Sequence, residues 1–171
     1  MKVLSFDIAT NTGVAFGRPG EVPLTKVIDL GTGKSDAARF AKALRMVEGF
    51  IEARQPDLIS VECPIGPGSS TLLVGLYACV VGQCMAMGHN PKRYQVQSIR
   101  KHFLGKALTS RDYPGLSKAE SRKEIKRVVI ARCNALGWRV DTDDEADAAA
   151  LWDFTIAKER AGGAMPKGLF G

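Results

Sequence analysis

A run of apolar residues near the N-terminus, Val3 to Ile8, is too hydrophobic for an edge strand and predicts a strand in the middle of a sheet. One charged residue, Asp7, interrupts the run. The polar segment Thr10–Gly13 is typical of a tight turn, and Val14–Phe16 then predicts the return strand of a hairpin. Burying an unpaired carboxylate is costly, so Asp7 either caps the turn or faces a cation.

Length and composition indicate one globular domain. The 171 residues suffice for one sizeable core, and we expect a single domain over residues 1–161 with a frayed tail over 162–171. No apolar run approaches the roughly 20 residues that span a bilayer, and no secretory signal is evident, so no membrane partner is expected. The four cysteines form no CxxC pair, which favours a reducing cytoplasm over a zinc site or a disulfide framework.

The positive charge of the chain is concentrated in residues 90–127. This segment holds eleven basic side chains against three acidic ones, whereas the remainder holds thirteen against fifteen. Local basicity favours a polyanion-binding surface, although a merely solvated face is the alternative.

Hydrophobic periodicity and turn signals predict the remaining elements. Strands are expected over 24–30, 58–61 and 94–96. Helices are expected from Ser35 to just before Pro56, over 71–87 (unusually apolar), from Ser98 to Leu104, and from Asp144 to about Ala161, with a flexible loop over 105–116. The capping box Ser117–Glu120 opens a further, basic helix, whose expected apolar face is Ile125, Val128, Val129, Cys133 and Leu136. The order of elements predicts a mixed α/β domain.

The 71–87 helix carries almost no charge, which favours burial against the sheet and against a second subunit.

The last helix begins among acidic residues, at a second predicted capping box formed by Thr142 to Glu145. Asp144 and Asp147 lie three positions apart and share one face of its first turn, with alanines around them that allow close packing on a sheet. Acids also favour helix N-termini through the macrodipole, which is the competing explanation. Asp147 discriminates between the two, because it lies on the apolar side with Leu151 and Phe154 and is expected to point inward.

Four acids from distant parts of the chain are therefore candidates for one site: Asp7, Glu62 at the end of the 58–61 strand, Asp144 and Asp147. Clustered carboxylates repel one another unless cations lie among them, and all-oxygen ligation suits Mg²⁺, with Mn²⁺ as a substitute. Two such ions about 4 Å apart are the usual arrangement for attack on a phosphodiester. Beside a basic segment, the expected substrate is nucleic acid.

These motifs resemble the RNase H-like superfamily and, within it, the RuvC type of Holliday-junction resolvase. The resemblance rests on Asp7 with Thr12–Gly13, on Val61–Glu62, on the Asp-x-x-Asp motif Asp144–Asp147 followed by alanines, and on the basic stretch 96–105. It implies an RNase H-like fold with a mixed five-stranded sheet flanked by helices. It also implies a homodimer that cuts four-way DNA junctions, leaving 5′-phosphate and 3′-hydroxyl ends.

By position, the resemblance assigns the four metal-ligand and catalytic roles to Asp7, Glu62, Asp144 and Asp147. It places Arg100 near a DNA-binding lysine of the family, and either Lys118 or Lys123 near another, with Lys123 favoured by its distance from the last motif. The basic residues expected to contact DNA are Arg100, Lys101, Lys106, Lys118, Arg122 and Lys123.

Three departures from the family pattern leave alternatives open. Ala9 stands where the first motif usually has glycine, Ile65 stands where the bacterial enzyme has an aromatic residue, and the 105–117 loop is long. A broader nuclease acting on branched DNA or RNA–DNA hybrid is one alternative, and a junction-binding protein without cleavage is another. An actin-like or sugar-kinase ATPase shares the hairpin but needs two such domains, which 171 residues cannot hold.

Overall fold

Five strands form one mixed sheet in the computed structural model, which describes residues 1–64 and 69–163. The strands are β1 (Val3–Asp7), β2 (Asn11–Gly17), β3 (Leu24–Asp29), β4 (Leu58–Cys63) and β5 (Lys92–Gln95). Their order across the sheet is β3-β2-β1-β4-β5, with β1 central as its apolar sequence predicts. β1 and β2 form an antiparallel hairpin in which Asp7 pairs with Gly13, and β1, β4 and β5 run parallel. The predicted mixed five-stranded sheet is confirmed.

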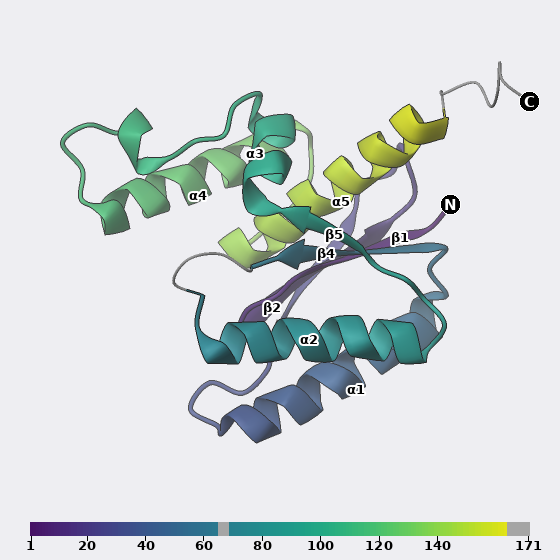
Figure 1. Ribbon diagram of the computed structural model, residues 1–171. Helices are drawn as coiled ribbons and strands as arrows, with labels where there is room; N and C mark the ends of the chain where they lie inside the picture. The colour runs from purple at the N-terminus through teal and green to yellow at the C-terminus, as the bar shows by residue number, and fades with distance from the viewer. Residues whose placement is uncertain (65–68, 164–171) are drawn as a thin grey trace, which may run out of the picture.

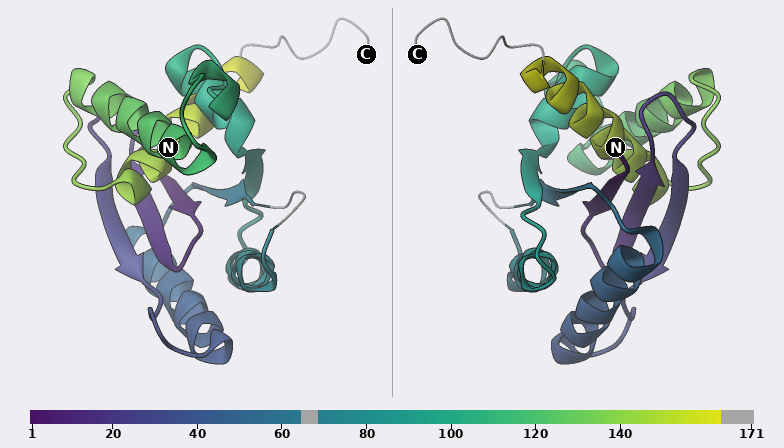
Figure 2. Two further views of the ribbon diagram at one scale, coloured as in Figure 1. Left: turned by 90° about the vertical axis from the view of Figure 1, so that its left-hand side faces the viewer. Right: turned by 90° about the vertical axis from the view of Figure 1, so that its right-hand side faces the viewer.

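Helices cover both faces of the sheet (Figures 1 and 2). One face carries α1 (Asp36–Arg54) and α2 (Thr71–Ala86). The other carries α3 (Val96–Leu104), α4 (Lys118–Ala135) and α5 (Asp143–Gly163), with a 3₁₀ turn at Ser110–Asp112 between α3 and α4. Each face therefore has its own hydrophobic core. Within the described residues, no helix is both long and apolar enough to cross a membrane.

Alanines at the start of α5 allow this helix to lie close to the sheet. Ala146, Ala148, Ala149 and Ala150 are fully or almost fully buried. Farther along, Trp152 packs edge-on against Trp138 and also reaches Gly17 of β2. The small residues bring the first turns of α5 onto the central strands, and the large ring fills the space that opens beyond them.

Several element boundaries differ from the prediction, including β5, which runs over Lys92–Gln95 rather than 94–96. α3 begins at Val96 rather than Ser98, because the chain passes from β5 into the helix through an extended Gln95 without a side-chain cap. The 105–116 segment is not wholly irregular, since Thr109 and Asp112 form a capping box around the 3₁₀ turn. α5 begins at Asp143 and reaches Gly163, beyond the predicted end near Ala161.

The apolar face of α4 is narrower than its sequence suggests. Its buried residues recur every fourth position, at Ser121, Ile125, Val129 and Cys133. Val128 and Leu136, expected on this face, are 37% and 39% exposed. The predicted tail beyond Gly163 and the atypical Ile65 lie outside the described residues.

Candidate active site at the carboxyl ends of β1 and β4

A buried contact among three hydroxyl groups fixes α5 against the two central strands. The Oγ atoms of Ser5 on β1 and Ser60 on β4 lie 2.7 Å apart, and the Thr155 hydroxyl of α5 lies 2.8 Å from the Ser60 Oγ. Thr155 also lies 2.7 Å from the carbonyl oxygen of Leu151, to which it can donate. All three side chains are fully buried. The contact therefore identifies which face of each strand looks toward α5.

Alternation along the strands carries the acids to the same face. Asp7 lies two residues beyond Ser5, and Glu62 lies two residues beyond Ser60, so both carboxylates project toward α5. On α5, Asp147 lies eight residues before Thr155, which places it on the same side of the helix two turns nearer the start. The carboxyl ends of β1 and β4 therefore meet the first turns of α5.

Gly13 allows the start of α5 to lie close to the β1–β2 hairpin. It pairs with Asp7 across the hairpin, and a Cβ atom built on it would lie 2.0 Å from the backbone oxygen of Asp144. Only a residue without a side chain lets the start of α5 approach the hairpin so closely. The Thr142 hydroxyl accepts from the Glu145 backbone N–H, and the Glu145 carboxylate accepts from the Thr142 backbone N–H, so the predicted capping box holds this end of α5.

The four predicted acids interact through their charges. Burial raises the pKa of Asp7 well above its ordinary value, and the charges of Glu62, Asp147 and Asp144 raise it further, in that order. Burial first, and then the Asp147 charge, raise the pKa of Glu62 to about 7. Burial also raises the pKa of Asp144 and Asp147. The structure thus brings together the residues that the sequence selected, and their negative charges are poorly compensated.

Arg100 supplies part of the compensation. Its guanidinium lies 3.9 Å from the Asp147 carboxylate, with side-chain exposures of only 24% and 17% for the two residues. The Arg100 charge lowers the pKa of both Glu62 and Asp147, opposing the effect of burial. Its Nε is buried without a hydrogen-bond partner among the described residues. Arg100 therefore lies among the carboxylates rather than on the outer basic surface.

Lys126 supplies the second positive charge, and the sequence interpretation did not single it out. Its ammonium contacts Asp143, and it lowers the pKa of Asp7, Asp144 and Asp147. The sequence carries part of the signal for Lys126. This residue follows Ile125 on α4, and Ile125 is buried on the face that packs toward α5. Only the packing of α4 onto α5 shows that Lys126 reaches the start of α5.

The other predicted DNA-contacting residues lie outside this cluster. Lys106 pairs with Asp112 at 3.1 Å. Lys101 is exposed on α3, and Lys118, Arg122 and Lys123 are exposed on α4 without an ion pair in the described part of the chain. Apart from Lys106, these side chains are free to meet a polyanion, but none of the five forms an ion pair with the four acids among the described residues.

The donor chemistry of these acids, though not their present spacing, is that of a site for a hard divalent cation. The charges of the acids from β4 and α5 raise the pKa of Asp7 on β1, and no hydrogen bond or ion pair within residues 1–64 and 69–163 engages the Asp7 carboxylate. Within the same residues, no three His, Cys, Asp or Glu side chains are gathered closely enough to hold a metal ion. Mutual repulsion opposes a tighter arrangement of these carboxylates, and a cation would relieve it.

Comparison with known proteins shows the fold. No family model matches the sequence, and no curated protein matches it. The structure is similar to RuvC of Thermus thermophilus, with a TM-score of 0.65 and 16% identity over 95% of this chain and 97% of that one. It is similar to T. thermophilus RuvC in complex with Holliday junction substrate, with a TM-score of 0.69 and 15% identity over 97% and 99% of the two chains.

The yeast mitochondrial Holliday junction resolvase Ydc2 has a similar structure as well. Its TM-score is 0.53, with 15% identity over 93% of this chain and 80% of that one. The chain thus has the RNase H-like fold of the RuvC resolvases, as its motifs predict.

Replacing Gly13 by alanine should push the start of α5 away from the hairpin. The added methyl group meets the backbone of Asp144, so we expect the free energy of unfolding to fall by about 1–3 kcal/mol in urea denaturation. Gly49→Ala is the control, because a Cβ there meets open space and should be neutral or stabilising. Equal stability of the two variants would contradict this role of Gly13.

The raised pKa of Glu62 predicts a pH-dependent stability in the metal-free protein. The fold binds this proton more tightly than the unfolded chain, so its stabilising effect is complete below about pH 4.5 and is lost as the pH rises through about 7. Because Glu62 is partly exposed, we expect a loss of about 1–3 kcal/mol, measured by urea unfolding with a chelator. Glu62→Gln should make the profile less steep, with the raised pKa values of Asp7 and Asp147 accounting for the remaining slope, and a flat wild-type profile would contradict the burial of these charges.

Proposed function

We propose that this chain, with the fold of the RuvC resolvases, is a metal-dependent endonuclease that resolves four-way DNA junctions. The observation that carries the proposal is the convergence of Asp7, Glu62, Asp144 and Asp147, whose pKa values are all raised. A protein that only bound DNA would gain nothing from carboxylates facing phosphates. The alternatives, cleavage of other branched DNA or hybrid and binding without cleavage, are outcomes of the cleavage assay described below.

In this proposal the four carboxylates bind two Mg²⁺ ions, for which Mn²⁺ can substitute. Bound there, the ions would supply an activated water and stabilise the leaving oxygen, giving 5′-phosphate and 3′-hydroxyl ends. Asp7 comes from the most central strand and is the carboxylate whose pKa the charges of all three others raise, so it is the best candidate for a metal ligand.

The basic residues divide into two roles. Arg100 is close enough to Asp147 to meet a phosphate held by cations bound to the carboxylates, and Lys126 balances the charge at the start of α5. The outer residues are assigned to the backbone of the junction arms: Lys101, Lys106, Lys118, Arg122 and Lys123. Such contacts fix the position of DNA without reading its sequence.

A second copy of the chain is proposed to cover α2. Val74, Ala78, Gly82 and Met85 form an exposed stripe of small and apolar side chains along this helix, on the side away from the core. Two active sites on one dimer would allow two symmetric nicks in a junction, and an interface of this kind presents the same surface from both copies.

Asp7→Asn should abolish cleavage while leaving junction binding intact. It removes one negative charge from the ligand set without changing the size of the side chain, so we expect at least a hundredfold reduction in rate. The assay incubates wild type and variant with a four-way junction, a linear duplex and an RNA–DNA hybrid, with and without Mg²⁺. Binding is measured separately with a chelator present.

Preferential cleavage of the junction by the wild type supports the proposal. Equal cleavage of all three substrates would favour the broader nuclease, and binding without cleavage would favour the junction-binding protein. Loss of binding in the variant would show that Asp7 has a structural role.

Ala78→Arg should dissociate the proposed dimer. It places a charge in the middle of the exposed stripe of α2, so sedimentation velocity should show a monomer where the wild type is a dimer. Glu52→Arg, which changes an exposed residue of α1, is the control and should remain dimeric. A monomeric wild type, or a dimeric Ala78→Arg variant, would contradict this interface.

A further inference from the structure

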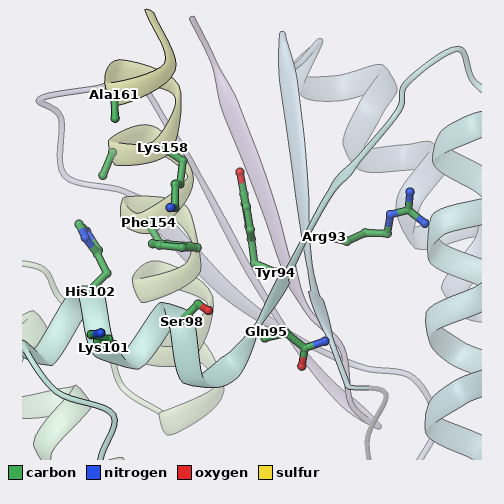
Figure 3. Close-up of a pocket in the computed structure, with 10 residues that line it drawn as sticks. Arg93, Tyr94, Gln95, Ser98, Lys101, His102, Phe154, Lys158 and Ala161 are labelled. Atoms are coloured by element: carbon green, nitrogen blue, oxygen red, sulfur yellow. The ribbon is translucent and has the colours of Figure 1, made fainter. Parts of the chain in front are cut away.

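A groove of about 760 Å³ runs between the edge strand β5, α3 and the second half of α5 (Figure 3). Tyr94 stands at its centre, with Phe154 of α5 beside it and Ser98 of α3 below. Arg93 points away from this space, toward the other face of the sheet. The side chains that matter for its chemistry are Tyr94, Gln95, Ser98, Lys101, Phe154 and Lys158.

The groove begins beside the carboxylates. Tyr94 is the partner of Glu62 in the pairing of β4 with β5. Phe154 lies seven residues after Asp147 on α5, which is two turns along the same side of the helix. Lys158 lies a further turn away, about 16 Å from Asp147 along the axis at 1.5 Å per residue. A DNA strand that leaves the carboxylates in this direction therefore enters the groove.

The lining combines positive charge with aromatic rings. Lys101 and Lys158 are exposed and have no ion pair in the described part of the protein. The Lys158 ammonium lies 5.4 Å from the Phe154 ring centroid, and Tyr94 packs edge-on against the same ring at 4.8 Å. Cations beside aromatic rings are the pattern by which proteins bind single-stranded nucleic acid.

The acids nearest the groove are already paired. Asp153 lies 2.9 Å from the His102 ring nitrogen, and Glu159 lies 3.8 Å from the Lys92 ammonium. No acidic side chain is among the described residues that line the groove. The unpaired charge facing it is therefore positive.

We propose that this groove binds one strand of DNA as it leaves the carboxylate site, with Lys101 and Lys158 contacting phosphates and Tyr94 contacting a base. The inference rests on the proposed nuclease function and extends it to an unpaired strand. A volume of about 760 Å³ is of the size that holds one small ligand, so the groove suits a short segment of one strand.

Binding of a short fluorescent oligothymidylate to the full-length protein tests the proposal. Anisotropy is measured with a chelator over a range of salt concentrations. Ser98→Trp fills the groove from an exposed position without changing charge, and we expect a roughly tenfold decrease in affinity. The double variant Lys101→Ala/Lys158→Ala should reduce the slope of log affinity against log salt by about 1.4, that is, by about 0.7 for each phosphate that the protein no longer neutralises.

Lys42→Ala/Arg45→Ala is the matched control, since it removes two exposed cations from a separate groove of α1 and β3. Affinity and slope should match those of the wild type. The proposal is overturned if the oligonucleotide does not bind, if Ser98→Trp binds it as tightly as the wild type does, or if the control changes the slope as much as the groove variant.

Junction cleavage by the same preparations separates this proposal from the one on which it rests. Cleavage together with groove-independent oligonucleotide binding would overturn the groove alone. Groove-dependent binding without cleavage of any substrate would overturn the nuclease and support the groove as a strand-binding site.

Discussion

The contact between the hydroxyl groups of Ser5, Ser60 and Thr155 determines where the acids of this protein lie. It joins the two central parallel strands to α5 at a depth that water does not reach. A buried polar group without a partner is costly, so the three elements are held in one register. From this register, the alternation of the strands and the turns of the helix bring Asp7, Glu62 and Asp147 to one end of the sheet.

The same packing creates an electrostatic problem at that end. Gly13 and the buried alanines let α5 approach so closely that several carboxylates share a poorly solvated space. Arg100 and Lys126 offset part of the repulsion, yet the pKa values of all four acids remain raised. An arrangement of this kind costs stability in the metal-free protein and is typical of functional sites.

The sequence was most informative where a local pattern had one physical solution. The apolar run around Asp7 required a central strand, and the capping boxes at Ser117 and Thr142 placed the starts of two helices to within a residue. It was least informative about relations that depend on how α3 and α4 pack onto α5. Arg100, which was predicted to contact DNA, lies beside Asp147, a neighbour that its place in the sequence did not indicate, and Lys126 could be assigned only once α4 was known to face the start of α5.

The central claim is that the four carboxylates share divalent cations. Coupling between metal binding and proton release tests this claim most directly. Because the pKa of Glu62 is about 7, part of the metal-free protein carries a proton there at neutral pH, and that proton must leave when a cation binds. Calorimetric titration with Mn²⁺ in two buffers of different ionisation enthalpy measures this release. We predict saturable binding with net proton release in the wild type and a smaller release in Glu62→Gln; saturable binding without proton release, or no binding, would contradict the account.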